Sequence, residues 1–231
     1  MRIIIDHALL YDTGIHPEVT EIRFSRGVAG DFFKDDRFPN LVKLCCSENR
    51  LSKLELNCPS LQELRCQNNQ LTKLELNCPS LQELNCSNNQ LTNLELNCPS
   101  LQRLWCFNNR LTKLELNCPS LQVLWCNNNR LTNLELDCPS LRVLWCGNNQ
   151  LTKLELNCPS LQDLHCHRNR LTELELNCPS LQTLWCQRNQ LTDLNGLEFC
   201  TELKKLYCSR ALEESAEILK HHLPDLQIEY R

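Results

Sequence analysis

A nine-residue phrase recurs along the chain with a spacing of 20 residues and no slippage. The phrase, Leu-Glu-Leu-Asn-Cys-Pro-Ser-Leu-Gln, first begins at Leu54, and a copy that begins at Leu134 differs only by Asp137 and Arg142. A fixed period of this length predicts a solenoid, in which each repeat packs only on its neighbours and the array forms one elongated body. The unchanged copies begin at Leu74, Leu94, Leu114, Leu154 and Leu174.

Each repeat also contains the motif Leu-x-x-Leu-x-Cys-x-x-Asn-x-Leu, which first begins at residue 41. Around Leu64 and Cys66 the apolar residues alternate with polar ones, which predicts a short strand. Leu64 and Cys66 should point inward, while Glu63 and Arg65 point outward. The return segment of each repeat ends in Cys-Pro, and Pro79 cannot donate a hydrogen bond to a ladder. We therefore expect an extended, irregular return side.

The asparagine of this motif is present in eight consecutive repeats. Its side chain carries two donors and an acceptor, so packing alone does not explain it. Placed at the bend after the strand, it can bond backbone groups of its own and neighbouring turns that would otherwise be buried unpaired. A role in ligand contact is disfavoured because every copy has it. The residues are Asn49, Asn69, Asn89, Asn109, Asn129, Asn149, Asn169 and Asn189.

The two ends of the chain depart from the repeat. Residues 1–38 contain Val19-x-x-Ile22-x-Phe24, a degenerate copy of the strand motif, and we interpret them as an N-terminal cap. Residues 39–210 form the array itself. An open solenoid end must hide its core, and atypical terminal repeats serve that purpose.

The C-terminal end is predicted to form a second cap over residues 211–231. A run of strong helix formers extends from Ala211 to Lys220. The pattern Leu223-x-x-Leu226-x-Ile228 then matches the strand motif once more. We expect a helix followed by a last strand.

Composition limits the environment and the class of partner. The 18 cysteines follow the repeat and occupy apolar positions, where free thiols behave as small hydrophobes. The apolar run before Asp6 is too short for a secretory signal, and no stretch is long enough to cross a membrane. We therefore expect a cytoplasmic protein with reduced thiols. The net charge of −4 does not provide the overall positive charge that favours binding to nucleic acid or to anionic membranes.

Over residues 41–210 the motif resembles the defining segment of leucine-rich repeat proteins, with Cys where Leu or Val often stands. The short period is similar to the bacterial class found in secreted effectors. The phrase Leu-Asn-Cys-Ser-Asn-Asn-Gln-Leu-Thr is still more similar to arrays of large DNA viruses of amoebae, the marseillevirus type in particular. The resemblance implies an α/β repeat solenoid, a horseshoe with a parallel concave β-sheet, an irregular convex side and a C-terminal capping helix and strand. It also implies protein binding on the concave face, no catalytic residues and, for a viral origin, the host cytoplasm.

Variation between the repeats concentrates at three strand positions on the predicted concave side. All four tryptophans lie in the middle position, and neighbouring strands are about 4.8 Å apart, so we expect a contiguous stack. An outward apolar patch of this kind usually marks an interaction surface. In order, the middle position holds Cys45, Arg65, Asn85, Trp105, Trp125, Trp145, His165, Trp185 and Tyr207.

This patch and its polar border are the candidate site for binding another protein. Two other interpretations stay open. Stacked rings can simply stabilise a sheet, or duplication of repeats in pairs can have copied one tryptophan. The candidate partner-binding residues are Arg103, Trp105, Phe107, Val123, Trp125, Val143, Trp145, Asp163, His165, His167, Trp185 and Tyr207.

A metal site is disfavoured, although Asp163, His165 and His167 share one strand face. A His-x-His pair on a strand can chelate zinc. One strand cannot easily converge three ligands, and the neighbouring strands offer no usual ligand. We expect no metal and no cofactor, and these residues are interpreted as a polar border to the tryptophan patch.

Nucleic-acid binding remains an alternative because of a short basic file, Arg168, Arg188 and Arg210, with Arg170 beside it. Cations beside stacked rings can hold single-stranded nucleic acid, but the net charge and the shortness of the file disfavour this. No nucleophile arrangement, phosphate loop or paired carboxylates in a cleft is present, so an enzyme is not expected. The sequence favours a protein-binding scaffold, with a structural or packaging protein or a single-stranded nucleic-acid binder as alternatives.

Overall fold

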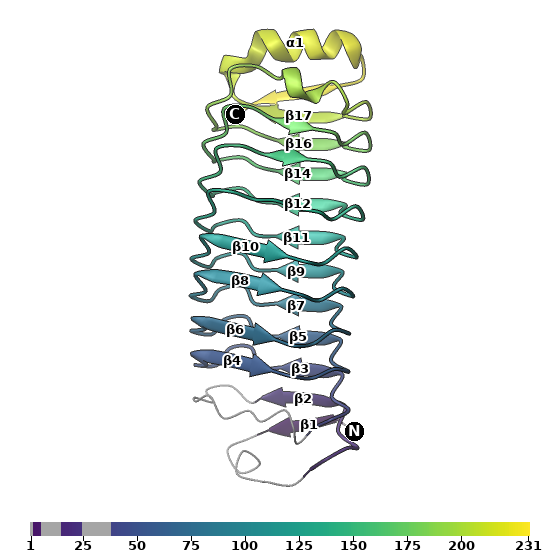
Figure 1. The fold of residues 1–231 in the computed structure, drawn as a ribbon. Coiled ribbons are helices and arrows are strands. Elements are labelled where there is room, and N and C mark those ends of the chain that lie inside the picture. The colour runs from purple at the N-terminus through teal and green to yellow at the C-terminus, as the bar shows by residue number, and fades with distance from the viewer. Residues whose placement is uncertain (1, 6–14, 25–37) are drawn as a thin grey trace.

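The computed structural model describes residues 2–5, 15–24 and 38–231. These residues form a tall stack of parallel strands that ends in a C-terminal helix (Figure 1). Each turn of chain adds one strand to a 12-stranded parallel sheet and then returns on the opposite side of the stack. The predicted repeat solenoid with a parallel sheet is confirmed.

Every neighbour in the large sheet is the next turn of the chain, so no crossover interrupts it. In order its strands are β1 (Arg2–Ile5), β2 (Glu21–Phe24), β3 (Lys43–Cys45), β5 (Glu63–Arg65), β7 (Glu83–Asn85), β9 (Arg103–Trp105), β11 (Val123–Trp125), β12 (Val143–Trp145), β14 (Asp163–His165), β16 (Thr183–Trp185), β17 (Lys205–Cys208) and β18 (Gln227–Tyr230).

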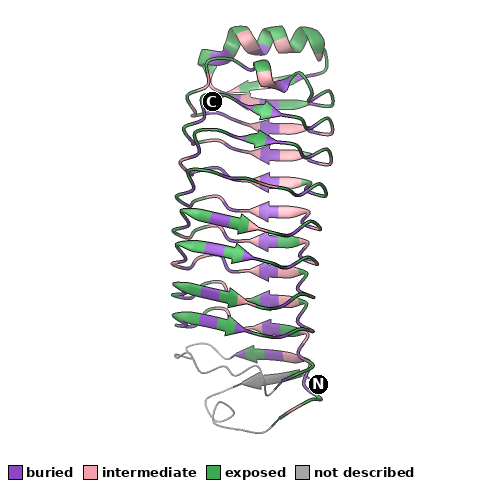
Figure 2. Cartoon of the chain, viewed as in Figure 1, coloured by how far each residue is buried: buried purple, intermediate pink, exposed green. Residues whose placement is uncertain are grey.

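The alternation of apolar and polar residues sets the faces of the large sheet. Leu64 and Cys66 are both fully buried, whereas Arg65 between them is exposed. The same pattern recurs in the strands from β3 to β17, so Figure 2 shows a buried centre flanked by less buried residues there. Because the repeat length is constant, strands pair in strict register, as Leu64 does with Leu84. The leucines and cysteines therefore form one continuous core between the two layers.

The return side is more regular than the sequence indicates. Short strands form before the prolines, and they pair two by two rather than as one continuous sheet. Pro79 lies outside these strands, which is why it does not prevent them. Residues 132–138 form no strand. The pairs are β4 (Lys53–Leu56) with β6 (Lys73–Leu76), β8 (Asn93–Leu96) with β10 (Lys113–Leu116), and β13 (Glu155–Leu156) with β15 (Glu175–Leu176).

The asparagines form the predicted ladder of backbone contacts. Asn129 is typical: its amide nitrogen donates to the carbonyl oxygens of Cys106 at 3.1 Å and of Cys126 at 3.0 Å. Its amide oxygen accepts from the backbone N–H of Leu111 at 3.0 Å. One side chain thus satisfies groups of its own turn and of the preceding one, and the same bonds recur at Asn149. The structural role predicted for this position is confirmed.

The turns that follow the eight strands of the large sheet from β3 to β16 each contain a residue with a positive φ angle, between 52° and 59°. Asparagine tolerates this left-handed conformation better than other residues with a Cβ atom. It occupies the position in five repeats, Asn68 to Asn148, while Glu48, Arg168 and Arg188 replace it in the others. The turn therefore requires the left-handed conformation whatever residue stands there.

The cysteines line the core in two files, as their place in the repeat predicts. Cys45 is the exception, because it occupies an outward position of β3 and is only half-buried. Burial raises the pKa of Cys86 to about 12, and burial aided by Cys118 and Cys78 raises the pKa of Cys98 to about 12. Uncharged thiols of this kind are poor nucleophiles.

The cysteines are expected to be reduced thiols in freshly purified protein. We predict that denaturation in an alkylating reagent adds one label per cysteine, 18 in all, without prior reduction. Intact mass spectrometry measures this directly. Neighbours in a file are about 4.8 Å apart, a spacing that disulfides can bridge, so the prediction depends on the cytoplasmic environment. A mass that shows several unlabelled pairs would contradict it.

The N-terminal strand motif is found where the sequence predicts it. Ile22 in β2 is fully buried and pairs with Leu44 of β3. The sequence does not predict β1, which pairs with β2 in parallel and adds a further strand. Most of the expected cap over residues 1–38 lies outside the described residues, so its boundary stays a prediction.

At the C-terminal end a helix and a strand follow the array, as predicted. The helix α1 (Glu213–His222) begins two residues after Ala211, because the 3-10 turn η4 (Arg210–Leu212) occupies that place. The strand β18 pairs with β17, with Ile228 beside Leu206. The short turn η3 (Asn195–Leu197) accommodates the insertion that breaks the repeat, and its glycine lies against the return strand.

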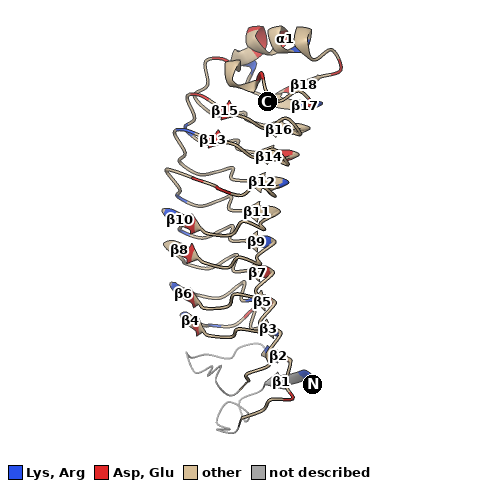
Figure 3. Cartoon of the chain, turned by 45° about the vertical axis from the view of Figure 1, so that its right-hand side comes forward, with Lys and Arg blue, Asp and Glu red and all other residues tan. Residues whose placement is uncertain are grey.

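The stack is gently bowed. In the turned view of Figure 3 the 12-stranded sheet lies on the inner side of the bow, and this side is called the concave face below. The short return strands lie on the outer side. Within the part of the chain that the structure describes, no helix has the length and apolar character needed to cross a membrane.

Candidate functional site

Strand register brings the aromatic residues of the concave face into one file. Trp125 pairs with Trp105 on one side and with Trp145 on the other. His165 then pairs with both Trp145 and Trp185, and Trp185 pairs with Tyr207. The six rings occupy six consecutive strands, from β9 to β17, and we call this row the ring ladder: Trp105, Trp125, Trp145, His165, Trp185 and Tyr207.

Most neighbours in the ring ladder stack face to face. Ring centroids are 4.3 Å apart for Trp125 and Trp145, with an interplanar angle of 3°, and 4.7 Å apart for Trp145 and His165. Trp185 and Tyr207 are 3.9 Å apart. The first step differs from the predicted stack, because Trp105 meets Trp125 edge-on at 6.3 Å. Edge-to-face pairs are as favourable as offset stacking, so the row remains continuous.

The rings are less exposed than the sequence indicates. All six are half-buried, and none is among the strongly exposed apolar side chains of the described residues, which are Ile15, Phe199 and Ile218. From Trp125 to Tyr207 neighbouring rings lie over one another, so little of their faces remains open to solvent, whereas Trp105 meets Trp125 edge-on. What the concave face presents is the row of ring edges rather than open ring faces.

The other apolar candidates border the ladder. Phe107 lies against Trp125 with centroids 6.2 Å apart. Val123 and Val143 are half-buried and pair with each other on β11 and β12. Arg103 is next to Val123 in the register, but it is exposed and forms an ion pair with Glu83. The sheet therefore brings together all the candidates of this part of the face.

Asp163 links two members of the ladder. Its Oδ2 accepts a hydrogen bond from Nε1 of Trp145 at 3.2 Å. Its Oδ1 lies 3.1 Å from Nε2 of His165, but the two atoms are not aligned for a hydrogen bond, so this contact is electrostatic. The carboxylate thus fixes both rings from the side of β14. No group of three or more metal-ligating side chains gathers in the described part of the chain.

His167 lies over the neighbouring strand. A Cβ atom added to Gly147 would be 2.6 Å from Cε1 of this ring, so a larger residue there would displace the ring from this position. Burial lowers the pKa of His167, and the positive charges of His165, Arg168 and Arg188 lower it further. The ring is therefore neutral at pH 7, and its Nδ1 is buried without a hydrogen-bond partner among the described residues.

Arg231 is part of the site but was not predicted from the sequence. Its guanidinium lies 4.8 Å from the ring centroid of Trp185 and 4.9 Å from that of Tyr207. A cation over an aromatic face is attracted by the ring quadrupole. Arg231 follows β18, so only the pairing of that last strand brings it to the ladder. The sequence offers only a weak signal for this role, because Arg231 is a single arginine one residue beyond the last strand.

Charges at the N-terminal end of the concave face neutralise one another. Glu63 forms ion pairs with Lys43 at 3.0 Å and with Arg65 at 2.6 Å. On the return side, Lys73 pairs with both Glu55 and Glu75. Apart from the half-buried Glu63, these side chains are largely exposed, so each pair contributes little to stability. They remove unpaired charge from both faces.

Solved structures of leucine-rich repeat proteins resemble this chain. The functional domain of InlJ from Listeria monocytogenes, described as including a cysteine ladder, is 29% identical with a TM-score of 0.75. The APL1 leucine-rich repeat domain is 26% identical with a TM-score of 0.76. YopM, a leucine-rich effector protein from Yersinia pestis, is 32% identical with a TM-score of 0.73.

These likenesses cover most of this chain but only part of the others. The aligned shares of this chain are 92%, 84% and 83%, and the aligned shares of InlJ, APL1 and YopM are 47%, 57% and 55%. The chain thus spans about half the length of the structures it matches. A search of curated proteins finds no match.

The family profile described as "Leucine Rich repeats (2 copies)" matches the chain in seven overlapping segments, from residues 59–99 to residues 179–221. Together these segments cover more than half of the chain. They also coincide with the turns that build the 12-stranded sheet and carry the ring ladder. The chain belongs to the leucine-rich repeat family.

Proposed function

We propose that this protein is a scaffold that binds another protein through the ring ladder on its concave sheet. The single observation that carries the proposal is the unbroken row of six rings on consecutive strands. Leucine-rich repeat proteins generally mediate protein interactions, and a solenoid sheet offers an extended surface for this. Repeat solenoids of this family are typically scaffolds rather than enzymes.

The composition of the ladder supports a protein partner. Tryptophan and tyrosine are enriched among the residues that dominate interface energetics. Trp125, Trp145 and Trp185 have low conformational freedom because they stack on their neighbours, so little entropy is lost on binding. The same stacking disfavours single-stranded nucleic acid, because base stacking needs free ring faces.

The cellular setting is also a proposal. We infer a cytoplasmic location from the buried, uncharged cysteines. The similarity of the repeat phrases to arrays of large DNA viruses of amoebae supports a viral origin, for which the host cytoplasm is the expected place. The thiol labelling described above bears on this inference.

Trp125→Ala is expected to weaken partner binding about thirtyfold, because a ring at the centre of an interface carries the largest truncation cost. It should also lower the free energy of unfolding by about 2 kcal/mol, since the ring contacts Trp105, Phe107 and Trp145. Partners are first captured from the source lysate on immobilised protein at moderate salt. Affinity is then measured by calorimetry with the identified partner.

Phe199→Ala is the matched control, because Phe199 is 59% exposed, outside the concave face. It removes an aromatic ring without touching the ladder and should leave affinity unchanged. If Trp125→Ala lowers the melting temperature but the folded fraction binds as before, the ladder only stabilises the sheet. If neither quantity changes, the ladder is a remnant of repeat duplication. Either result overturns the proposal.

A further inference from the structure

One edge of the solenoid carries a row of arginines with no acidic partner. It is formed by the turns that follow the strands of the large sheet, in the C-terminal half of the array. All six side chains are exposed, and none forms an ion pair or a side-chain hydrogen bond with any residue that the structure describes. We call this row the arginine edge: Arg110, Arg130, Arg168, Arg170, Arg188 and Arg210.

The row differs from the other charged surfaces of the molecule. On the return side, Lys113 and Lys153 form ion pairs with glutamates. On the concave face, Arg65 and Arg103 do the same. The short segments that follow five consecutive strands contain no Asp or Glu: residues 106–112, 126–132, 146–152, 166–172 and 186–192. This edge therefore keeps positive charge over several turns without a nearby carboxylate in the same segments.

Two of these arginines stand in an unfavourable backbone conformation. Arg168 has a φ of 55° and Arg188 a φ of 58°, at the position where five other repeats have asparagine. The left-handed conformation is costlier for arginine than for asparagine. The fold does not need arginine there, since the repeat already supplies a better residue. A local cost without a structural benefit points to a function for the side chain.

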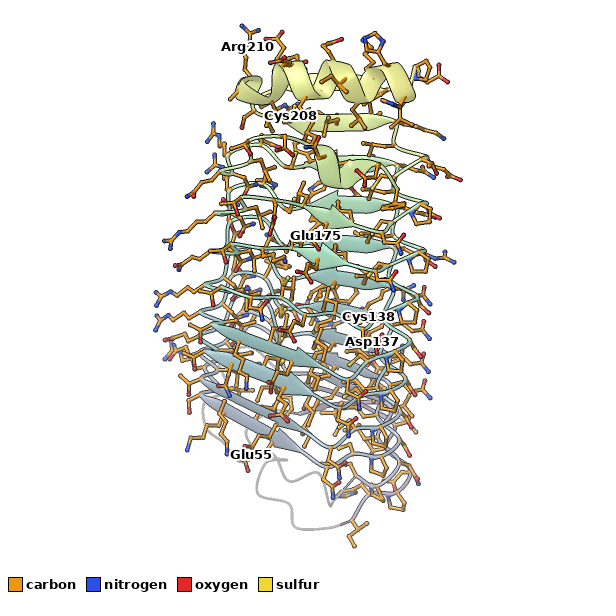
Figure 4. The ribbon with its side chains drawn as sticks, turned by 45° about the horizontal axis from the view of Figure 1, so that its top comes forward. Glu55, Asp137, Cys138, Glu175, Cys208 and Arg210 are labelled. Atoms are coloured by element: carbon orange, nitrogen blue, oxygen red, sulfur yellow. The ribbon has the colours of Figure 1, made fainter. Side chains whose placement is uncertain are left out.

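The arginines lie close enough to act together. From β9 to β17 the row spans five strand spacings, about 24 Å in all. The charges of Arg168 and Arg188 both act on His167 between them and the ladder. Figure 4 shows Arg210 projecting into solvent at the C-terminal end of the row, whereas Glu55 and Glu175 project from the return side.

We propose that the arginine edge binds a carboxylate-rich segment of a partner protein. Each guanidinium can hold a carboxylate through two parallel hydrogen bonds, which lysine cannot do. A row of about 24 Å matches an extended segment of about seven residues. Nucleic acid fits less well, because the net charge is −4 and most rings of the ladder are covered by a stacked neighbour. The inference concerns a second surface and does not depend on the ring ladder.

The test uses a fluorescent octaglutamate peptide and the full chain, with polarisation as the readout at low salt. The double variant Arg168→Asn/Arg188→Asn installs the residue that other repeats carry, so it should fold and melt at the same or a higher temperature. We expect it to weaken peptide binding about tenfold, since exposed ion pairs contribute modestly and two are lost. Binding should also weaken as salt is raised.

The matched control is Arg142→Gln, which removes an exposed arginine outside the row and installs the residue of six other repeats. It should leave peptide binding unchanged. Equal loss in both variants would show a general charge effect, and no loss in the double variant would show that the row does not bind carboxylates. An octathymidylate that binds more tightly than octaglutamate would assign the edge to nucleic acid. Each of these results overturns the proposal, while Trp125→Ala tests the concave face separately.

Discussion

Above pH 9 the protein is expected to unfold over a narrow range of pH. Burial raises the pKa of the core thiols in the folded state, to about 12 for Cys146 and about 11 for Cys138, where Cys118 and Asp137 add to the effect. In the unfolded chain the same thiols titrate near the ordinary value of 9.0. The thiols with a raised pKa include those of Cys46, Cys66, Cys86, Cys98, Cys106, Cys118, Cys126, Cys138, Cys146, Cys158, Cys166, Cys178, Cys186, Cys200 and Cys208.

The decrease in stability with rising pH follows from the number of protons that each state binds. Above pH 9 the unfolded chain loses thiol protons that the folded chain keeps, so the unfolded state binds fewer protons and stability falls as pH rises. Each thiol lowers the free energy of unfolding by about 1.4 kcal/mol per pH unit in this window. Because a domain has a net stability of only about 5–15 kcal/mol, several thiols together suffice to unfold it within about one pH unit. Below pH 9 these thiols have no such effect.

The measurement is a pH titration from 7 to 12 in the presence of reductant, followed by circular dichroism and by ultraviolet absorbance of the thiolate. We expect secondary structure to be lost and thiolates to appear in the same narrow transition. The slope of stability against pH, obtained from urea unfolding at several pH values, gives the number of thiols involved. A free energy of unfolding that stays constant between pH 9 and pH 11 would contradict the prediction that the buried cysteines are reduced and protonated in the folded state.

Asn129→Leu is expected to lower the free energy of unfolding by about 1–3 kcal/mol, because the buried backbone N–H of Leu111 loses its partner and two buried carbonyls each lose one of two donors. The carbonyl of Cys106 keeps Asn109 as a donor, and the carbonyl of Cys126 keeps Asn149. Leucine fills the space but cannot donate or accept a hydrogen bond. Urea unfolding at pH 7 measures the change, and the slope of the transition shows whether the array still unfolds in one step.

Asn117→Leu is the matched control for this substitution. Asn117 also belongs to a row of asparagines, since its amide nitrogen donates to Oδ1 of Asn97 at 2.9 Å. That row is exposed, however, so water can replace the lost bond. The control should change stability by about 0.5 kcal/mol or less. If the two variants unfold at the same urea concentration, the buried ladder is not what holds neighbouring turns together.

The sequence by itself determined the architecture of this protein. A constant period of 20 residues predicts a solenoid of stacked turns. The alternation of apolar and polar residues around Leu64 and Cys66 predicts which side chains are buried and which face solvent. The recurrence of Asn129 and its equivalents in the sequence predicts the ladder of side-chain hydrogen bonds to the backbone. These inferences succeed because they depend on spacing along the chain, which repetition copies from turn to turn. The aromatic row follows for the same reason, since register is fixed when every repeat has one length.

Only the tertiary structure decided how the rings meet and what completes the site. Trp105 turns edge-on while Trp145 stacks flat, although both flank Trp125 in the same register. Arg231 reaches the ladder through the pairing of the last strand, and His167 lies over a neighbouring turn at Gly147. Side-chain rotamers respond to neighbours across strands rather than to neighbours in sequence.

The return side also has features that the sequence alone does not predict. Its short strands pair two by two, and residues 132–138 pair with neither neighbour, although the seven copies of the phrase are nearly identical. The left-handed turns at Arg168 and Arg188 likewise carry residues that local preference does not predict. The shared core holds the backbone of each turn in place through its buried leucines and cysteines. Local preference is therefore overruled wherever packing of the whole stack sets the conformation.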